Sequence, residues 1–437
     1  MASLTSLEFL ASILRRKDWI TTSRETFVTI RRILSFMQVK YLRCVRCGRQ
    51  YPKGEIRYRC DCGDSLEIVY DYGEIKGRIS WEELRSRRYD HWRYREFYPP
   101  LKVGNIVTMG EGGTPLIRSR NLEQALFPGC ELLFKIEGTN PTGSFKDRGS
   151  TVEISEAYDY LCDHGPECKN EIVCASTGNM GASVAAYCAR AGIVCTIYVP
   201  HDTARIKLLQ MMAHGAKIVK VKGDYTMAML TAKHEYEEHG RYLAGDYPYR
   251  GEGEKSVGLE IVDVLGGEVD FIACPVGNGT LLHGIWKGLK ELKTVGLLDR
   301  LPKIIGAQAE GCNTVVKALD KGTDRIIPVI PHTLMDAVAC GDPLDGMWAL
   351  RAIRESGGVG VAVSDEEAAR ARDSLAKQEG IFAELSGALS FAGLQKAYAS
   401  GMVEKDAKIA VVVSGHGLKE PETFAEEMRK IREMEPQ

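Results

Sequence analysis

From residue 131 onward, short runs of apolar residues alternate with longer stretches whose apolar residues recur every three or four positions. The short runs predict buried strands, and the longer stretches predict amphipathic helices. Strands that alternate with helices are typical of α/β folds with parallel sheets. The predicted strands lie at 132–136, 171–175, 193–199, 218–221, 271–276 and 409–413, and the predicted helices lie at 151–161, 182–191, 204–214, 227–238 and 283–292.

Before residue 131 the pattern changes. Residues 66–70 are rich in β-forming residues and predict the last strand of a small ribbon, and residues 81–88 predict a helix. The aromatic residues around Trp92 and Tyr94 are expected to anchor a linker on the core. Residues 1–40 form an amphipathic arm that is too acidic for a targeting peptide. We expect either a helical arm that packs on the body or on a partner subunit, or translation that begins at Met37.

Composition excludes several classes of function. The chain has 437 residues and a net charge of -2, which gives no argument for nucleic-acid binding. No apolar run approaches the roughly 20 residues that a membrane helix requires. Of the thirteen cysteines, Cys174, Cys195 and Cys274 lie inside apolar runs and are expected to be buried thiols. Buried free thiols indicate a reducing compartment, so we expect a cytoplasmic protein.

Four other cysteines form two close pairs. Cys44 and Cys47 are separated by two residues, and Cys60 and Cys62 by one, with a glycine after each pair. Paired thiolates on two turns can make a tetrahedral zinc site, although the second gap is tighter than usual. The alternative is four reduced cysteines without metal. Zinc is favoured because so short a segment has little core of its own.

A single lysine lies in a turn between a predicted strand and a predicted helix. The turn reads Asn-Pro-Thr-Gly-Ser-Phe-Lys-Asp-Arg-Gly over residues 140–149, and the lysine is Lys146. A desolvated lysine can lose its proton and attack carbonyl groups. An isolated lysine in such a turn would more simply be a surface residue.

Three further loops follow predicted strands, at the edge of a parallel sheet where ligands bind. Residues 176–181 offer hydroxyls, an amide and backbone N–H groups that could hold a carboxylate, or simply cap a helix. Residues 277–281 are rich in glycine and open a helix, as a phosphate site requires. Residues 414–419 carry Ser414 and His416, and the histidine between glycines is interpreted as a turn residue.

Together these motifs resemble the threonine synthases, within the fold type II family of pyridoxal-phosphate (PLP) enzymes. The resemblance covers about residues 41–425 and implies two three-layer α/β domains with parallel-rich sheets, preceded by a zinc-ribbon-like segment. It implies that Lys146 forms the internal aldimine with PLP. The implied domains are an arm at 1–40, a cysteine knuckle at 41–75 and a catalytic body at 76–430, with a smaller mobile subdomain at about 152–240.

The resemblance also implies roles for residues of the loops. Asn179 would bind the phenolic oxygen of PLP, and Ser414 its ring nitrogen. Arg250, otherwise interpreted as a surface arginine in a loop, would bind the substrate phosphate through its bidentate fork. The PLP phosphate would be held by Gly277, Asn278, Gly279, Thr280 and Leu281, the substrate carboxylate by Ser176, Thr177 and Met180, and a structural zinc ion by Cys44, Cys47, Cys60 and Cys62.

The implied activity is a carbon–oxygen lyase of threonine biosynthesis, which converts O-phospho-L-homoserine and water to L-threonine and phosphate, in an enzyme that is commonly dimeric. The chain departs from the family pattern at Gly245, Asp336 and Leu385, which affects the choice of substrate, and at Leu281 in the loop for the PLP phosphate, where the hydroxyl of Thr280 could compensate. Three alternatives remain open. They are β-replacement on O-phosphoserine, as in cysteate synthase, a serine or threonine dehydratase type of lyase, and a PLP-binding relative without catalysis.

Overall fold

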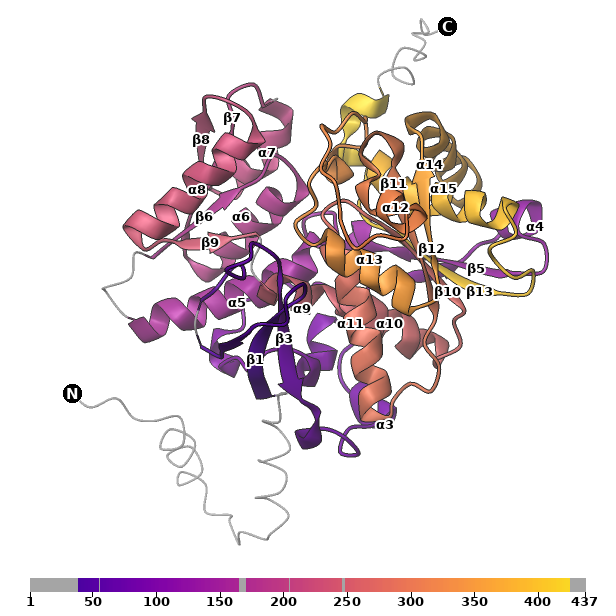
Figure 1. The fold of residues 1–437 in the computed structure, drawn as a ribbon, viewed down its shortest axis with the longest axis horizontal. Helices are drawn as coiled ribbons and strands as arrows, with labels where there is room; N and C mark the ends of the chain where they lie inside the picture. Colours follow the sequence, from indigo (N-terminus) through magenta and orange to yellow (C-terminus); the bar gives the residue numbers. More distant parts are fainter. Residues whose placement is uncertain (1–37, 55, 165–169, 204, 246–247, 425–437) are drawn as a thin grey trace, which may run out of the picture. The chain divides into compact units, whose positions relative to one another are not determined.

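A computed structural model describes residues 38–54, 56–164, 170–203, 205–245 and 248–424. The predicted N-terminal arm lies, up to residue 37, outside the described residues. Within these ranges the strands form three sheets, one small and antiparallel and two dominated by parallel pairs. Figure 1 shows the two larger sheets side by side, with the strands β6 to β9 gathered apart from β10 to β13.

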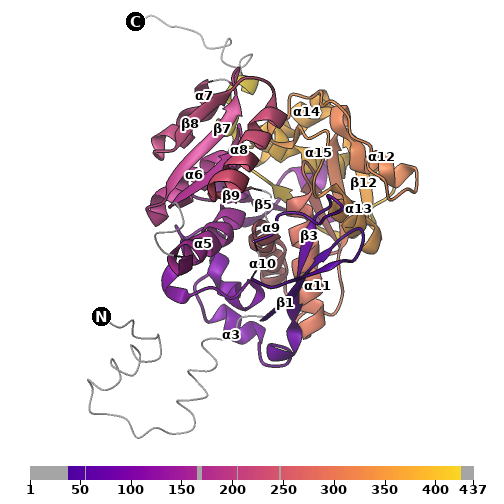
Figure 2. The same ribbon diagram turned by 60° about the vertical axis from the view of Figure 1, so that its left-hand side comes forward.

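The small antiparallel sheet is the ribbon predicted around the paired cysteines. Its strands are β1 (Gln38–Cys44), β2 (Gln50–Pro52) and β3 (Leu66–Asp71), in the order β2-β1-β3. Every second residue of β3 is buried, as its alternating pattern indicates. β3 lies beside α9 (Pro248–Glu254), where the Tyr70 hydroxyl donates a hydrogen bond of 2.7 Å to the Glu252 carboxylate (Figure 2).

A linker connects this ribbon to the body. It contains α3 (Trp81–Arg85) and a 3-10 segment, η2 (His91–Phe97). Tyr94 and Phe97 are fully buried in the main core, and Trp92 packs against it. The prediction that these aromatic residues anchor the linker is therefore confirmed.

The largest sheet has the strand order β12-β11-β10-β13-β5-β4, and only β4 is antiparallel to its neighbour. Alternate residues of its strands face two separate cores, since Ile272 belongs to one core and Phe271 to the other. Helices therefore cover both faces, as expected for a parallel sheet. The strands are β4 (Leu116–Arg118), β5 (Glu131–Ile136), β10 (Phe271–Pro275), β11 (Lys303–Ala309), β12 (Val359–Val363) and β13 (Lys408–Val413), and the helices of this part are α4 (Leu122–Leu126), α10 (Ser256–Leu265), α11 (Thr280–Val295), α12 (Thr314–Asp320), α13 (Gly346–Glu355), α14 (Asp365–Glu379) and α15 (Leu385–Ala399).

The third sheet, in the order β8-β7-β6-β9, is parallel throughout and has a core of its own. Helix α6 contributes much of that core, because most of its residues are buried. The elements are β6 (Glu171–Ala175), β7 (Val194–Pro200), β8 (Lys217–Val221) and β9 (Tyr242–Ala244), with α5 (Lys146–His164), α6 (Asn179–Ala191), α7 (Arg205–Ala213) and α8 (Tyr225–His239).

The α/β architecture with parallel sheets is confirmed, and the predicted strands are present. Three helices at the site begin earlier than predicted, at Lys146, Asn179 and Thr280. The first turns at Lys146 and Asn179 carry polar residues and glycines, and the turn at Thr280 directly follows the glycine-rich loop, so the helical pattern is obscured at these starts. No helix within the described ranges is apolar over enough residues to cross a bilayer.

Candidate active site

Four loops meet at the carboxyl ends of parallel strands. Strands β10, β13 and β5 are neighbours in the large sheet, and each is followed by one of the candidate loops. The lysine loop and the Ser414 loop are joined through their backbones, since Phe145 N donates to Ser414 O at 3.0 Å. An isolated bridge between Ser144 and Gly415 extends this pairing. The fourth loop follows β6 of the smaller sheet.

Lys146 is the first residue of α5 and is half-buried. Its ammonium group lies 4.4 Å from the centroid of the Phe145 ring. The turn before it is fixed by Asp147, whose two carboxylate oxygens accept hydrogen bonds of 2.7 Å from the backbone N–H and the hydroxyl of Thr142. Lys146 thus lies on the first turn of α5, next to the Phe145 ring and beside a turn that the Asp147 carboxylate fixes.

Beneath this turn lies a cluster of four buried charges. Arg148 is fully buried and donates two hydrogen bonds to each of the carboxylates of Glu137 and Glu260, at 2.6–2.8 Å. Lys135 donates to Glu260 at 2.6 Å, so that two cations balance two carboxylates. Burial opposes ionisation of Glu260, but Arg148 and Lys135 outweigh it and hold the pKa of Glu260 well below its usual value.

Asn179 and Ser414 are brought together through one buried carboxylate. Asn179 Nδ2 donates to Glu384 Oε2 at 2.8 Å, and Ser414 Oγ donates to Glu384 Oε1 at 3.2 Å. All three residues are buried, and burial raises the pKa of Glu384. The carboxylate therefore lies between the two groups expected to bind the phenolic oxygen and the nitrogen of a pyridine ring.

The predicted carboxylate loop closes on itself through Ser176. Its hydroxyl accepts hydrogen bonds from the N–H groups of Gly181, at 2.9 Å, and Gly178, at 3.4 Å. Ser176 is buried, whereas Thr177 and Met180 are half-buried. The hydroxyl of Thr177 and the N–H groups at the start of α6 are consequently the groups best placed to receive a carboxylate.

The glycine-rich loop opens the 16-residue helix α11, which has no side-chain N-cap. Gly279 has a φ of 104°, and a Cβ there would lie 2.6 Å from the carbonyl oxygen of Asp345, so glycine is required. Leu281 points into the core. Backbone N–H groups rather than side chains would therefore bind a phosphate here, and the helix dipole would favour its charge.

Arg250 lies on helix α9 and is only 2% exposed. The interpretation as a surface arginine in a loop is thus wrong, because its guanidinium is buried against Glu153 at 3.0 Å and near Glu254 at 3.7 Å. It also donates to the carbonyl oxygen of Lys146 at 3.1 Å. Burial raises the pKa of Glu254, and neither of its oxygens accepts a hydrogen bond from a described residue. Arg250 is therefore adjacent to the lysine turn and paired with carboxylates.

The four cysteines of the ribbon form a cluster. Their sulfur atoms all lie within 4.8 Å of one another, with 3.5 Å between Cys44 and Cys62 and 3.6 Å between Cys47 and Cys60. A tetrahedral zinc ion with Zn–S bonds of about 2.3 Å separates its sulfur ligands by about 3.8 Å. The geometry thus fits a zinc ion, and the tight gap in the second pair does not prevent it. The other described cysteines are free thiols, and Cys174, Cys195 and Cys274 are buried as predicted.

Two acidic residues at the site were missed by the sequence reasoning. Glu384 follows the apolar residues 381–383, and a carboxylate after such a run is unusual, so this position could have been singled out from the sequence. Asp345 has no signal in its local sequence, because its partners lie elsewhere in the chain.

Two of the departures from the family pattern lie near these loops. Asp336 is exposed, and its carboxylate lies 4.0 Å from the place of a Cβ on Gly178. Gly245 donates its N–H to Glu153 at 2.8 Å.

Comparisons with known proteins identify the relatives of this chain. The family described as "Pyridoxal-phosphate dependent enzyme" matches residues 107–415. The threonine synthase of Methanocaldococcus jannaschii is 45% identical over 386 residues, which cover 87% of this chain and 93% of that protein. The threonine synthase of Methanosarcina acetivorans is 39% identical over 389 residues, 88% of this chain and 93% of that protein. The one from Mycobacterium tuberculosis strain H37Rv is 38% identical and covers 77% of this chain and 90% of that protein.

Solved structures show the same fold at lower identity. The processed threonine deaminase isoform 2 of Solanum lycopersicum aligns with a TM-score of 0.61 and 24% identity, over 72% of this chain and 83% of that one. Maize serine racemase aligns with a TM-score of 0.60 and 22% identity, over 72% of this chain and 92% of that one. At these identities the likeness concerns the fold alone.

Proposed function

The chain belongs to the pyridoxal-phosphate dependent enzymes and, within them, to the family of the threonine synthases, and we propose that it converts O-phospho-L-homoserine and water to L-threonine and phosphate. One observation supports this most strongly. Lys146, Asn179, Ser414 and the uncapped start of α11 converge at the edge of the parallel sheets. Relatives of 38–45% identity that span most of the chain carry the name of that activity.

PLP fits the residues that meet there. Asn179 would bind the phenolic oxygen and Ser414 the ring nitrogen, in the place where both contact the Glu384 carboxylate. A serine hydroxyl at the ring nitrogen leaves that nitrogen largely without a proton. The backbone N–H groups from Gly277 to Leu281 would hold the coenzyme phosphate.

PLP supplies an electron sink for charge that develops on the substrate carbons. Lys146 is the proposed catalytic base, which takes the proton from the substrate Cα and moves protons at Cβ and Cγ while phosphate leaves Cγ and water adds at Cβ. Its place on the first turn of α5 orients the amine, because Asp147 and the Arg148 cluster fix that turn. Ser176, Thr177 and Met180 would bind the α-carboxylate.

Arg250 is the proposed ligand of the substrate phosphate. Its guanidinium is already charged, buried and adjacent to the lysine turn, which favours binding of a dianion in a site with little water. At present Glu153 and Glu254 neutralise it, so the phosphate would compete with or share these partners. The glycine at 245 offers no hydroxyl at that position, whereas the Ser150 hydroxyl accepts a hydrogen bond of 3.3 Å from Arg250.

The four-cysteine cluster is proposed to hold a structural zinc ion. A set of four thiolates is closed to substrate, and the cluster lies on a separate sheet, so we assign it no catalytic role. Free thiols at buried and clustered positions favour a reducing compartment, and we propose the cytoplasm. The dimer implied by the resemblance stays a prediction.

The decisive experiment is a phosphate-release assay on purified, PLP-loaded protein with O-phospho-L-homoserine, O-phospho-L-serine plus sulfite, and O-phospho-L-threonine. We expect release from phosphohomoserine with equimolar L-threonine. Turnover of phosphoserine and sulfite alone would instead identify a β-replacement enzyme. In parallel incubations with L-serine or L-threonine, formation of a keto acid and ammonia would identify a dehydratase.

A further inference from the structure

Asp345 occupies the N-cap position of helix α13 but does not cap it. An aspartate at this position usually accepts a hydrogen bond from the N–H groups of the first turn. Here no such bond exists, and Asp345 contributes only its backbone carbonyl to Trp348 and Ala349. Its carboxylate is 17% exposed and uses its two oxygens on two other segments.

One oxygen binds the predicted phosphate loop. Thr280 Oγ donates to Asp345 Oδ2 at 2.6 Å, and Asn278 Nδ2 lies 3.3 Å from the same oxygen. The backbone is joined as well, because Asp345 N donates to Asn278 O at 3.1 Å, and Leu344 N donates to Asn278 Oδ1 at 2.7 Å. Asp345 thus fixes the conformation of the loop whose N–H groups would receive the coenzyme phosphate.

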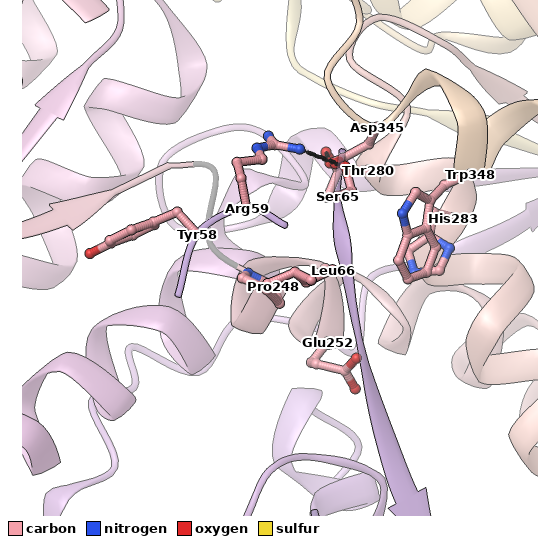
Figure 3. Close-up of a pocket in the computed structure, with 11 residues that line it drawn as sticks. Tyr58, Arg59, Ser65, Leu66, Pro248, Glu252, Thr280, His283, Asp345 and Trp348 are labelled. Carbon is pink, nitrogen blue, oxygen red and sulfur yellow. Dashed lines mark hydrogen bonds and ion pairs between the residues drawn. The ribbon is translucent and has the colours of Figure 1, made fainter. Parts of the chain in front are cut away.

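The other oxygen faces the cysteine ribbon. The Ser65 hydroxyl lies 2.6 Å from Asp345 Oδ1 and 2.7 Å from Leu344 O. Arg59 Nη1 donates to the Ser65 hydroxyl at 2.5 Å and forms an ion pair of 3.4 Å with Asp345. Figure 3 shows the Arg59 side chain reaching toward Asp345, with Ser65 and Thr280 drawn close to it. These residues line a cavity of about 20 Å³, room for roughly one water molecule.

Arg59 and Ser65 belong to the turn that carries the second cysteine pair. Arg59 directly precedes Cys60, and Cys60 N donates to Asp64 O at 2.9 Å, which closes the turn next to Ser65. Ser65 O in turn accepts a bond of 3.1 Å from Val45 N, in the first cysteine turn. Four thiolates around one metal ion would hold both turns in this arrangement, and without the metal no bond would join the two cysteine pairs.

We propose that the metal-loaded cysteine ribbon positions the coenzyme phosphate loop through Ser65, Arg59 and Asp345. Asp345 is a positioning residue in this scheme, because it acts on the phosphate through the backbone of residues 278–280. This inference rests on the proposed function, since it requires PLP at the site. It assigns to the ribbon an effect on coenzyme affinity, beyond a contribution to stability.

The test compares full-length wild type with Ser65→Ala, each with zinc bound and after chelation. The readouts are the zinc content and the dissociation constant for PLP, measured from the visible absorbance of the bound coenzyme. We expect Ser65→Ala to retain zinc and to bind PLP about tenfold more weakly, because the Asp345 carboxylate loses a partner. We expect chelation to weaken PLP binding in wild type but to weaken it little further in Ser65→Ala. Chelation and the substitution both act on the same contact between the ribbon and Asp345.

Glu67→Gln is the matched control, because Glu67 lies on the same ribbon but pairs with Arg43 at 2.8 Å instead of facing the phosphate loop. We expect wild-type affinity from it. Arg59→Met alters the same contact as Ser65→Ala and takes its place should that variant fail to fold. Two results would overturn this inference and leave the proposed function standing. One is a PLP affinity in Ser65→Ala equal to that of wild type, and the other is a loss of PLP affinity on chelation that is as large in Ser65→Ala as in wild type. A wild type that binds no PLP would overturn the proposed function together with it.

Discussion

Arg148 offers a direct test of how the lysine turn is supported. The substitution Arg148→Met keeps a long apolar side chain and removes the guanidinium. Four hydrogen bonds to Glu137 and Glu260 are lost, and the buried cluster changes from two cations and two carboxylates to one cation and two carboxylates. Breaking a buried ion pair in this way costs about 3–5 kcal/mol.

The control is Lys102→Met. Lys102 pairs with Asp163, but the two side chains are 55% and 58% exposed, and exposed pairs contribute roughly 0–1 kcal/mol. Both variants are compared with wild type by urea unfolding followed through tryptophan fluorescence. We expect a large decrease of the unfolding midpoint for Arg148→Met and almost none for Lys102→Met.

The loss in Arg148→Met should also depend on pH. In wild type the pKa of Glu260 is depressed, so its pairing stabilises the fold above the ordinary carboxyl pKa and is lost as pH falls. With only Lys135 left, the pKa of Glu260 is expected to rise, and the variant is penalised as pH increases. The deficit relative to wild type should therefore be larger at pH 8 than at pH 5. A deficit below about 1 kcal/mol at pH 8, equal to that of the exposed control, would refute the argument from burial.

Three further predictions concern other parts of the chain. Lys146→Ala should abolish the visible band of lysine-bound PLP, and a persisting band, or borohydride labelling of a different lysine, would remove Lys146 from its proposed role. Replacing Cys44 and Cys47 by serine should lower zinc content and melting temperature while leaving turnover per PLP-loaded site largely unchanged, so a loss of turnover in loaded, folded protein would contradict a structural role. Burial and the nearby Glu384 raise the pKa of Glu420 to about 8, which weakens the fold as pH rises from about 4.5 to 8. Glu420→Gln should therefore make the melting temperature less sensitive to pH between 6 and 9, and an unchanged pH profile would count against the buried carboxylate.

The parallel sheets were predictable because each strand is a short apolar run between turn residues, as at Phe271–Pro275. Helix starts at the site were not predictable, since the first turn at Lys146 is polar and the turn at Thr280 directly follows a glycine-rich loop, although Leu281 is buried in the core. Arg250 was expected on a loop because the glycines at 251 and 253 obscure the pattern of a helix. Gly253 is nevertheless required within α9, because a Cβ there would lie 1.9 Å from the carbonyl oxygen of Arg148.

The candidate residues were found through short motifs, but their partners were not. Glu384 joins Asn179 to Ser414, and Asp345 joins the ribbon to the phosphate loop, across long separations in sequence. Periodicity reports only on neighbours along the chain, so contacts of this kind emerge only from the folded arrangement. The chemical roles of Lys146 and of the loop residues stay predictions until the assays above are made.

Strand β13 lies between β10 and β5 in the middle of the large sheet, although it is the last strand described in the chain. A nascent polypeptide therefore exposes the facing edges of β10 and β5 until residues 408–413 have been synthesised. Strand pairs that are distant in sequence form slowly, and an unpaired strand edge can form hydrogen bonds with another chain. A message truncated before Lys408 would yield a product with an open sheet and no partner for the lysine loop, which we expect to be a substrate for proteolysis instead of a less active enzyme.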